Sequence, residues 1–230
     1  LGTTNPPRLF FASRSDDKAE KYRRDFQGDG GFGSYEKALS DPRVHAVVIC
    51  TPHHLHVEHA RLAAVNGVHI LMEKPLARTP READEIIRVV RQSRSKTGSR
   101  CFLMVAENFR FKPSVRKARR LMEDGVVGKL KHVRVKTLTL ASHGGWRRSQ
   151  ENMGGGAFID GGIHWVDTVL YWAGPAKSVY AVAGPQTNEN VPFEDTIHVL
   201  SEHENGVVGE LTHSWGVPGP GMFQFSSING

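Results

Sequence analysis

The sequence has few cysteines and no long apolar segment. Its 230 residues include two cysteines, Cys50 and Cys101, and both lie in apolar, strand-like segments where we expect buried thiols. Two such residues do not form a disulfide framework, so we expect a reducing cytoplasm. No apolar run approaches the ~18 residues that a membrane-spanning helix needs. The first residues show neither an initiator methionine nor a signal-peptide pattern. We therefore expect a cytoplasmic protein with no membrane partner.

A glycine-rich phosphate loop is also missing from its expected context. The formal match to G-x-G-x-x-G is residues 28–33, which follow a predicted helix and open only a short one. A dinucleotide-binding loop instead joins a strand to a helix. We interpret residues 28–33 as a flexible turn. The first strand–loop–helix of such a fold is thus predicted to be absent, with the chain beginning near the second strand.

The composition is that of a soluble globular protein with one large or two modest domains, 39% hydrophobic and 23% charged. The net charge of +6 is uneven, because residues 110–136 hold ten Lys and Arg against two acidic residues, or +8. A nucleic-acid partner is one interpretation. The stretch has no interleaved aromatics and no known binding motif, so we favour a solvated helix face and predict no nucleic-acid partner. A field that attracts anionic ligands is a third interpretation.

The first half of the chain alternates predicted strands with predicted helices. The strands are 8–13, 44–50, 68–72 and 101–106, and the helices are 16–26, 34–40, 54–66 and 80–95. This alternation indicates βαβ units and a mostly parallel sheet. The run Val44–Cys50 is almost wholly apolar, as in a strand buried on both faces.

The second half is different, because its last strands follow one another without helices between them. We predict helices at 114–123 and 158–172, and strands at 129–140, 178–183, 196–202 and 207–214. This order favours an antiparallel or mixed sheet with helices on one side. The predicted fold is therefore α/β: a truncated Rossmann-type parallel sheet in residues 1–107, then an α+β domain with an open, mostly antiparallel sheet in residues 108–230.

Residues 154–167 form the most informative segment. Asp160 and His164 are four residues apart, which places them on one face of a helix. A carboxylate beside an imidazole can orient the ring, as a general acid or base requires. An amphipathic helix with a solvated polar face is the alternative. Gly161 and Gly162 argue against it, because a helix interior rarely contains glycine unless backbone approaches a ligand or another element closely.

Polar residues also follow each predicted parallel strand, where ligands bind in open parallel sheets. If the strands are parallel, these residues share one edge of the sheet. Lys74 could then lie close to Asp160 and His164, although they are about 90 positions away in the sequence. These strand ends are Arg14, Thr51-Pro52-His53, Glu73-Lys74-Pro75 and Glu107-Asn108. The histidines at 53, 54, 56 and 59 suggest a metal site, but no carboxylate or cysteine cluster completes it, so we predict no metal.

Four motifs together resemble those of the Gfo/Idh/MocA oxidoreductase family. The resemblance extends across nearly the whole chain. The motifs are Thr51-Pro52-x-x-x-His56, Glu73-Lys74-Pro75, Asn108-x-Arg110-x-x-Pro113, and Gly154-Gly155-Gly156-x-x-x-Asp160-x-x-x-His164-x-x-Asp167. Members of this family are longer and carry the glycine loop, so the resemblance implies a fragment. It also implies hydride transfer between NAD(P) and a sugar, cyclitol or related polyol, and a homo-oligomer formed through the C-terminal sheet.

By matched positions, the resemblance implies catalytic roles for Lys74, Asp160 and His164. His164 would take the hydroxyl proton with Asp160 orienting it, while Lys74 stabilises the developing alkoxide. Arg110 would join these three residues in binding substrate. The cofactor-binding residues would be Ser13, Arg14, Thr51, Pro52, His53, His56, Glu73, Lys74 and Asn108.

The residues after the first strand bear on the choice of cofactor. NAD enzymes usually carry Asp or Glu at the end of the second strand of their fold, whereas this chain has Ser13 and Arg14, followed by Asp16 and Asp17. Arg14 could pair with a 2′-phosphate, so NADP is favoured over NAD. A non-catalytic relative that binds dinucleotide or sugar is the alternative function. The presence of Lys74, Asp160 and His164 together favours the enzyme, because a pure binder needs no base.

Overall fold

The computed structural model describes residues 6–189, 191, 193–219 and 221–230, which divide into two compact units. The first unit contains the described residues up to Thr51, then Leu55–Met72 and Pro80–Met104. The second contains Pro52–His54, Glu73–Thr79 and Val105–Gly230. Two short segments from the first half of the sequence therefore belong to the second unit. The domain limits of 1–107 and 108–230 stay a prediction.

The first unit begins with a two-stranded parallel sheet. Helix α1 (Asp16–Asp25) joins β1 (Phe10–Ala12) to β2 (Gly30–Phe32), with Phe10 paired to Gly30. The interpretation of residues 28–33 as a flexible turn is therefore wrong, because residues 30–32 form a strand. A side chain on Gly31 would lie 3.2 Å from the Ala19 carbonyl carbon, so the glycine lets α1 pack against this strand.

A second sheet of the first unit has the order β3-β4-β5, and β3 and β4 are parallel. Its strands are β3 (Ala46–Ile49), β4 (His69–Met72) and β5 (Leu103–Val105). The helices in this part of the chain are α2 (Tyr35–Ser40), η1 (His53–Leu55), α3 (His56–Val65) and α4 (Pro80–Gln92), and His53 and His54 of η1 belong to the second unit. These elements confirm the predicted alternation. The expectation that the strand at 44–50 is buried on both faces is wrong. Val48 is 59% exposed, and Cys50 is exposed as well, because the described part of the unit covers only one face of β3.

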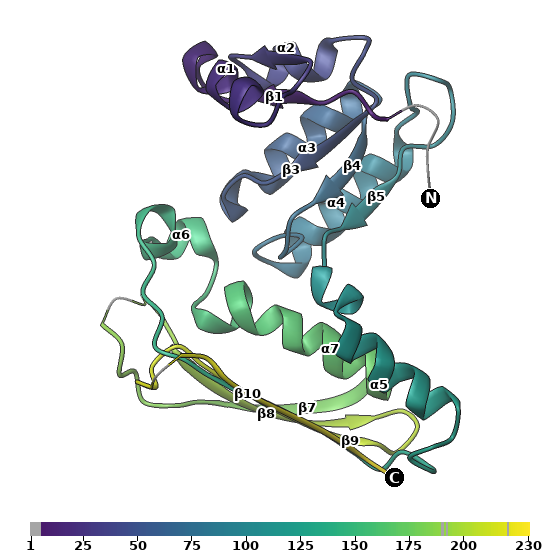
Figure 1. Ribbon diagram of the computed structural model, residues 1–230, viewed down its shortest axis with the longest axis vertical. Helices are drawn as coiled ribbons and strands as arrows, with labels where there is room; N and C mark the ends of the chain where they lie inside the picture. The colour runs from purple at the N-terminus through teal and green to yellow at the C-terminus, as the bar shows by residue number, and fades with distance from the viewer. Residues whose placement is uncertain (1–5, 190, 192, 220) are drawn as a thin grey trace. The chain divides into compact units, whose positions relative to one another are not determined.

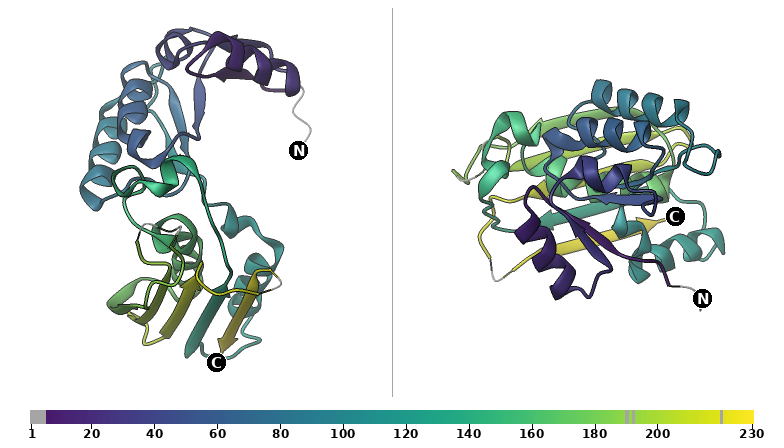
Figure 2. Two further views of the ribbon diagram at one scale, coloured as in Figure 1. Left: turned by 90° about the vertical axis from the view of Figure 1, so that its left-hand side faces the viewer. Right: turned by 90° about the horizontal axis from the view of Figure 1, so that it is seen from above.

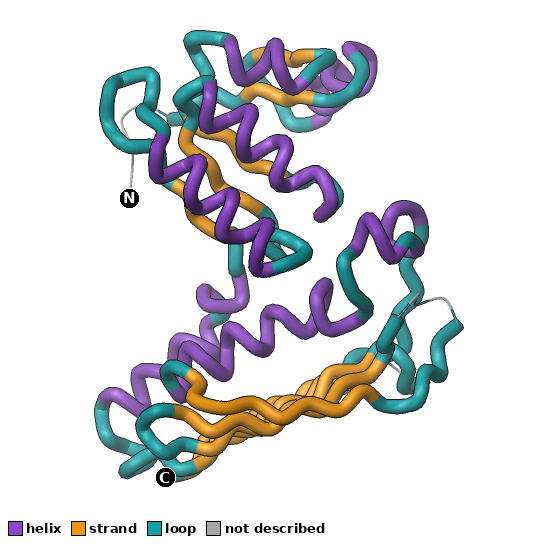
Figure 3. The backbone as a smooth tube through the Cα atoms, turned by 180° about the vertical axis from the view of Figure 1, so that it is seen from behind, coloured by secondary structure: helices purple, strands orange, loops and turns teal. Residues whose placement is uncertain are grey.

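A five-stranded mixed sheet dominates the second unit. Its order is β10-β6-β9-β8-β7, in which β6 and β9 are parallel and the other neighbours are antiparallel. The strands are β6 (His132–Leu138), β7 (Ala176–Ala183), β8 (Thr196–His203), β9 (Val208–Ser214) and β10 (Phe223–Asn229). Helices α5 (Pro113–Glu123) and α7 (Ile163–Ala173) lie on one face of this sheet (Figures 1 and 3). The predicted α/β fold with an open, mostly antiparallel second sheet is confirmed.

The core of the second unit lies between this sheet and the two helices. Val133 and Val135 of β6 are completely buried, whereas Arg134 between them faces the other side and is exposed. Trp172 of α7 packs in the same cluster, and its indole Nε1 donates a hydrogen bond to the Val115 carbonyl of α5 at 3.1 Å. The alternating pattern of residues 129–140 thus decides which face of the sheet receives the helices.

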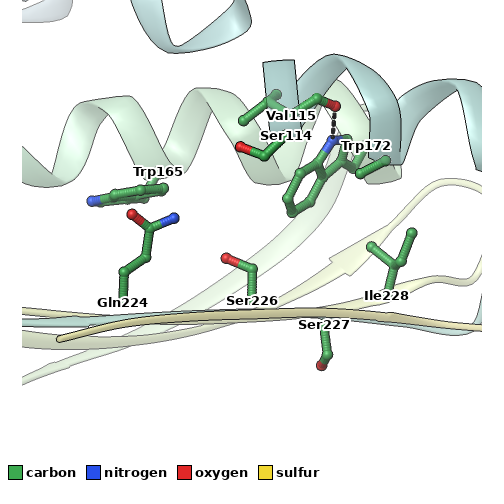
Figure 4. A pocket seen from close by; sticks show the side chains of 9 residues that line it. Ser114, Val115, Trp165, Trp172, Gln224, Ser226, Ser227 and Ile228 are labelled. Carbon is green, nitrogen blue, oxygen red and sulfur yellow. Dashed lines mark hydrogen bonds between the residues drawn. The ribbon is translucent and has the colours of Figure 1, made fainter. Parts of the chain in front are cut away.

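The edge strand β10 leaves part of this core unfilled. Figure 2 shows it, in yellow, at the side of the sheet. Gln224, Ser226 and Ile228 point toward the helices and Ser227 points away (Figure 4). A cavity of about 200 Å³ lies between these side chains and the helices, lined also by Ser114, Val115, Ala118, Trp165 and Trp172. Its lining includes none of the predicted catalytic residues. No helix among the described residues has the length and apolar character needed to cross a membrane.

Candidate active site

Asp160 and His164 lie near the start of the long helix of the second unit, but only His164 is in its regular α-helical part. Residues Phe158–Gly162 form a π-helical turn that continues into α7. A π turn holds more residues than an α turn. The first turn of this segment therefore does not have the α-helical spacing that the prediction assumed. The prediction of one regular helix over 158–172 is wrong in its first turn.

Glycines permit the close packing of this segment. Gly154 has φ +82°, a conformation that side chains disfavour, and a Cβ there would lie 2.5 Å from the Cβ of Arg78. A Cβ on Gly161 would lie 2.7 Å from His213 Nε2 and 2.9 Å from Trp215 Cζ2. The π turn therefore rests directly on the side chains at the end of β9. The sequence-based expectation that backbone approaches another element here agrees with these distances.

The Asp160 carboxylate is held between two cations. Lys74 Nζ donates to Oδ1 at 3.0 Å, and Arg147 Nε, from the short helix η3 (Gly145–Arg148), donates to Oδ2 at 2.6 Å. The Asp160 side chain is only 5% exposed. Burial by itself would raise the pKa of Asp160, but Lys74 and Arg147 outweigh it and lower the pKa to about 2. Asp160 is therefore ionised at neutral pH, and both of its oxygens are engaged.

His53 completes the surroundings of Asp160. Its ring is 3% exposed, with Nε2 3.7 Å from Asp160 Oδ1 and Nδ1 hydrogen-bonded to the Met153 carbonyl at 3.1 Å. Trp146 packs edge-on against the ring, with the centroids 4.5 Å apart. Met153 belongs to the short helix α6 (Gln150–Met153). The segment 144–153 thus contributes Trp146, Arg147 and a carbonyl to one side of this site.

His164 has a different carboxylate partner from the one predicted. Its Nδ1 lies 2.6 Å from Glu107 Oε1, whereas Asp160 bonds to Lys74 and Arg147. The prediction that Asp160 orients the His164 ring is therefore wrong. The physical reason is that Lys74 and Arg147 occupy both oxygens of the Asp160 carboxylate, while Glu107, in the segment after β5, lies beside His164 Nδ1.

Glu107 and Phe109 enclose the imidazole of His164. The Phe109 ring stacks on it with centroids 4.0 Å apart and planes 12° apart. Glu107 Oε1 also accepts the Phe109 backbone N–H at 3.1 Å. Burial would raise the pKa of Glu107, but the hydrogen bond with His164, with smaller contributions from Phe109 and Lys74, lowers it overall.

Arg110, a predicted substrate contact, is bound within the protein. Its Nε and one terminal nitrogen donate to the two oxygens of Asp167 at 2.7 and 2.8 Å, a bidentate pair. Its guanidinium also lies 5.4 Å from the centroid of the Tyr171 ring. This pair joins the short helix η2 (Asn108–Phe111) to α7. A role in substrate binding stays a prediction for Arg110.

The predicted cofactor residues after β3 and β4 form local hydrogen bonds. The Thr51 carbonyl accepts from His56 Nε2 at 3.0 Å, and its hydroxyl bonds His59 Nδ1 at 2.9 Å. Glu73 Oε2 accepts the Lys74 backbone N–H at 3.1 Å. Pro52 is half-buried in the second unit, and Asn108 is exposed at the start of η2.

Ser13 and Arg14 lie at the carboxyl end of β1 in the first unit. Ser13 is buried and its N–H donates to the Phe32 carbonyl at 3.0 Å, whereas Arg14 is exposed. Ser15 then caps α1 by accepting the Lys18 N–H. The guanidinium of Arg14 forms no ion pair with any described residue.

Two site residues were missed as functional residues in the sequence analysis. Glu107 was recognised as a strand end, and its position beside Asn108 was the available signal. Arg147 had no comparable signal, because its segment shows neither periodicity nor a motif before the structure brings it to Asp160. Both residues hydrogen-bond partners that are distant in the sequence: Glu107 and His164 are 57 positions apart, and Arg147 and Asp160 are 13 positions apart.

Two family models match the sequence of this chain. The model described as "Oxidoreductase family, NAD-binding Rossmann fold" matches residues 10–99, and the one described as "GFO/IDH/MocA C-terminal domain" matches residues 115–227. The chain belongs to the Gfo/Idh/MocA family of oxidoreductases. The family predicted from the four motifs is thus confirmed.

Among curated relatives, levoglucosan dehydrogenase of Pseudarthrobacter phenanthrenivorans is 32% identical over 77% of this chain and 45% of its own length. Trans-1,2-dihydrobenzene-1,2-diol dehydrogenase of Mus musculus is 30% identical over 88% of this chain and 59% of its own. The chain therefore spans about half the length of these relatives. A solved structure of levoglucosan dehydrogenase in complex with NADH has a TM-score of 0.87 and 29% identity, covering 98% of this chain and 62% of that one.

The packing of the π turn predicts a clear effect of Gly161→Ala. The added Cβ would meet His213 and Trp215, so we expect the free energy of unfolding to fall by about 1–3 kcal/mol. Gly144→Ala is the control, because a Cβ there meets no described atom within 4 Å and its φ is −102°. Chemical denaturation of both variants measures the effect. Equal stability of the two would contradict the close packing of Gly161.

Proposed function

We propose that this chain belongs to an NAD(P)-dependent dehydrogenase that acts on a CH–OH group of a sugar or related polyol. The observation that carries the proposal is the pairing of Lys74 Nζ with Asp160 Oδ1 at 3.0 Å, in the same unit as a carboxylate-bound His164. Names of relatives support the substrate class: they include levoglucosan dehydrogenase and the D-glucoside 3-dehydrogenase of Escherichia coli. A related structure contains NADH together with levoglucosan.

The side chains divide the chemistry among them. When bound, a nicotinamide cofactor supplies the hydride acceptor. His164 takes the proton of the reacting hydroxyl as the hydride leaves the carbon that carries this hydroxyl. Lys74 is a cation beside that hydroxyl and stabilises the negative charge that develops on its oxygen. Asp160 is not a base in this proposal, because its pKa is about 2 and both oxygens are bound. It holds the Lys74 ammonium in place.

In a full-length version of the protein, we expect Lys74→Ala and His164→Ala each to lower kcat far more than they weaken cofactor binding. General acid–base groups typically contribute about 10²–10⁴-fold to the rate. The measurements are steady-state turnover with a panel of sugars and cofactor titration by calorimetry. Lys177→Ala, which changes an exposed lysine of β7, is the control. Turnover like that of the wild type in either variant would reject the catalytic assignment and favour a binding role.

The finer choice of cofactor that we propose is NADP(H). The support is Arg14, an exposed guanidinium at the carboxyl end of β1, where the adenosine ribose lies in dinucleotide-binding sheets. A guanidinium and the nearby hydroxyl of Ser13 fit a 2′-phosphate by donor chemistry. Asp16 is the competing candidate for the ribose hydroxyls of NAD. Its carboxylate lies against Gly33, because a Cβ on that glycine would meet it.

In a full-length version of the protein, we expect Arg14→Ala to weaken the binding of NADP(H) about ten- to a hundredfold and to leave that of NAD(H) nearly unchanged. Hydrogen bonds to charged groups are worth about 1.5–3 kcal/mol, and NAD offers only neutral hydroxyls at this position. Titrating both cofactors against both proteins measures the preference, with Arg24→Ala, at the other end of α1, as the control. Equal weakening of the two cofactors would show that Arg14 only stacks on adenine.

We also propose that the outer face of the five-stranded sheet forms homo-oligomer contacts. This face is the one opposite α5 and α7, and it carries exposed apolar side chains near both edges. Tyr180 of β7 and Leu200 of β8 are direct neighbours there, 70% and 49% exposed, and Phe223 and Phe225 of β10 are 54% and 43% exposed. The Arg134–Glu210 ion pair lies between these two groups.

We therefore expect the double variant Tyr180→Lys, Leu200→Lys to reduce the oligomer to a smaller species. Charges on both neighbours would have to be buried without partners. Sedimentation velocity at several concentrations measures the change, and Lys117→Glu, on the exposed surface of α5, is the control. A monomeric wild type, or an unchanged double variant, would contradict this surface.

A further inference from the structure

We propose that Glu107 is a positioning residue that fixes His164 as the Nδ1–H tautomer and so leaves the Nε2 lone pair as the base. The link to catalysis rests on the proposed function, whereas the tautomer itself does not. Glu107 lies outside the four motifs that relate the chain to its family. The juxtaposition of Glu107 and His164 is created by the fold, because 57 positions separate them.

The direction of the hydrogen bond follows from the chemistry of its two partners. Glu107 Oε1 and His164 Nδ1 are 2.6 Å apart, and their side chains are 10% and 14% exposed. The lowered pKa of Glu107 keeps it ionised at neutral pH. An ionised carboxylate has no proton to donate, so Nδ1 must be the donor. In the neutral ring, Nε2 is then the unprotonated nitrogen.

The geometry that enforces this tautomer is constrained in two directions. Within the ring plane, Glu107 sets the position of Nδ1, and the Phe109 N–H holds the same carboxylate oxygen at 3.1 Å. Perpendicular to the plane, Phe109 stacks on the imidazole, and the Lys112 ammonium lies 3.1 Å from the Phe109 ring centroid. The His164 ring therefore has little freedom to turn and exchange its two nitrogens.

Other charged groups near His164 do not substitute for Glu107. Asp160 bonds through both oxygens to Lys74 and Arg147. Lys74 and Lys112 are cations that act on Glu107 itself. Burial, followed by the field of His164, lowers the pKa of His213 to about 4, so His213 is neutral at neutral pH. Among the described residues, Glu107 is the carboxylate that hydrogen-bonds this imidazole.

Nitrogen-15 NMR of the histidine-labelled chain tests the tautomer without any turnover. We expect the neutral His164 ring, identified by the loss of its signals in His164→Gln, to be protonated at Nδ1. Glu107→Gln keeps an oxygen that accepts the same N–H, so the tautomer should persist. Glu107→Leu removes the acceptor, and Nε2–H should become populated. A wild-type ring protonated at Nε2 would overturn the proposal. So would a Glu107→Leu ring identical to that of the wild type. If Glu107→Leu fails to fold, the wild type and Glu107→Gln decide.

Turnover measurements separate positioning from a merely structural role. Glu107→Leu should lower kcat by about 10²-fold or more, with the Kd for cofactor unchanged, because the base is then in the wrong tautomer. Glu107→Gln should lose less. A merely structural role would not distinguish the two variants by their hydrogen-bond acceptor, so an unchanged kcat in Glu107→Leu, or equal losses in Glu107→Leu and Glu107→Gln, would reject the role. A failure of the proposed dehydrogenase activity would leave the NMR result standing.

Discussion

The ion-paired Asp160 carboxylate is the constraint on which the second unit's site depends. A carboxylate that is 5% exposed must be compensated, because an isolated buried charge is strongly destabilising. Two cations from separate parts of the chain, Lys74 and Arg147, provide the compensation. Their convergence explains why the segment 73–79 belongs to the second unit rather than to the sheet that precedes it in the sequence. The pair also fixes where the Lys74 ammonium lies.

The two buried carboxylates of the site, Asp160 and Glu107, have different partners. Asp160 binds cations through both oxygens, whereas Glu107 binds the imidazole of His164. The pKa of each carboxylate is lowered despite burial, so both remain anionic at neutral pH. His164 thereby keeps an anionic partner of its own and does not compete with Lys74 for Asp160. This separation is possible because Lys74 and Arg147 bind both oxygens of Asp160, and a second carboxylate, Glu107, lies beside His164 Nδ1.

Much of the fold could be predicted from local patterns. The alternation of strands and helices in the first half of the chain and the consecutive strands in the second half are both present in the structure. Residues 30–32 were missed, because a three-residue strand containing two glycines has no local β signal and exists through its pairing with β1. The exposure of Val48 was also missed, since an apolar run records what a strand can bury and not what lies against it.

The sequence by itself determined the family, most of the helices and strands, and the expectation that Lys74 meets Asp160, because motif spacing and strand ends are local properties of the chain. Only the tertiary structure decided how the hydrogen bonds are distributed. The spacing of Asp160 and His164 indicates that the two side chains lie near each other, but it does not show which other polar groups lie nearer to each of them. Glu107 and Arg147 then become the partners, because hydrogen bonding depends on distances between atoms and not on spacing along the chain.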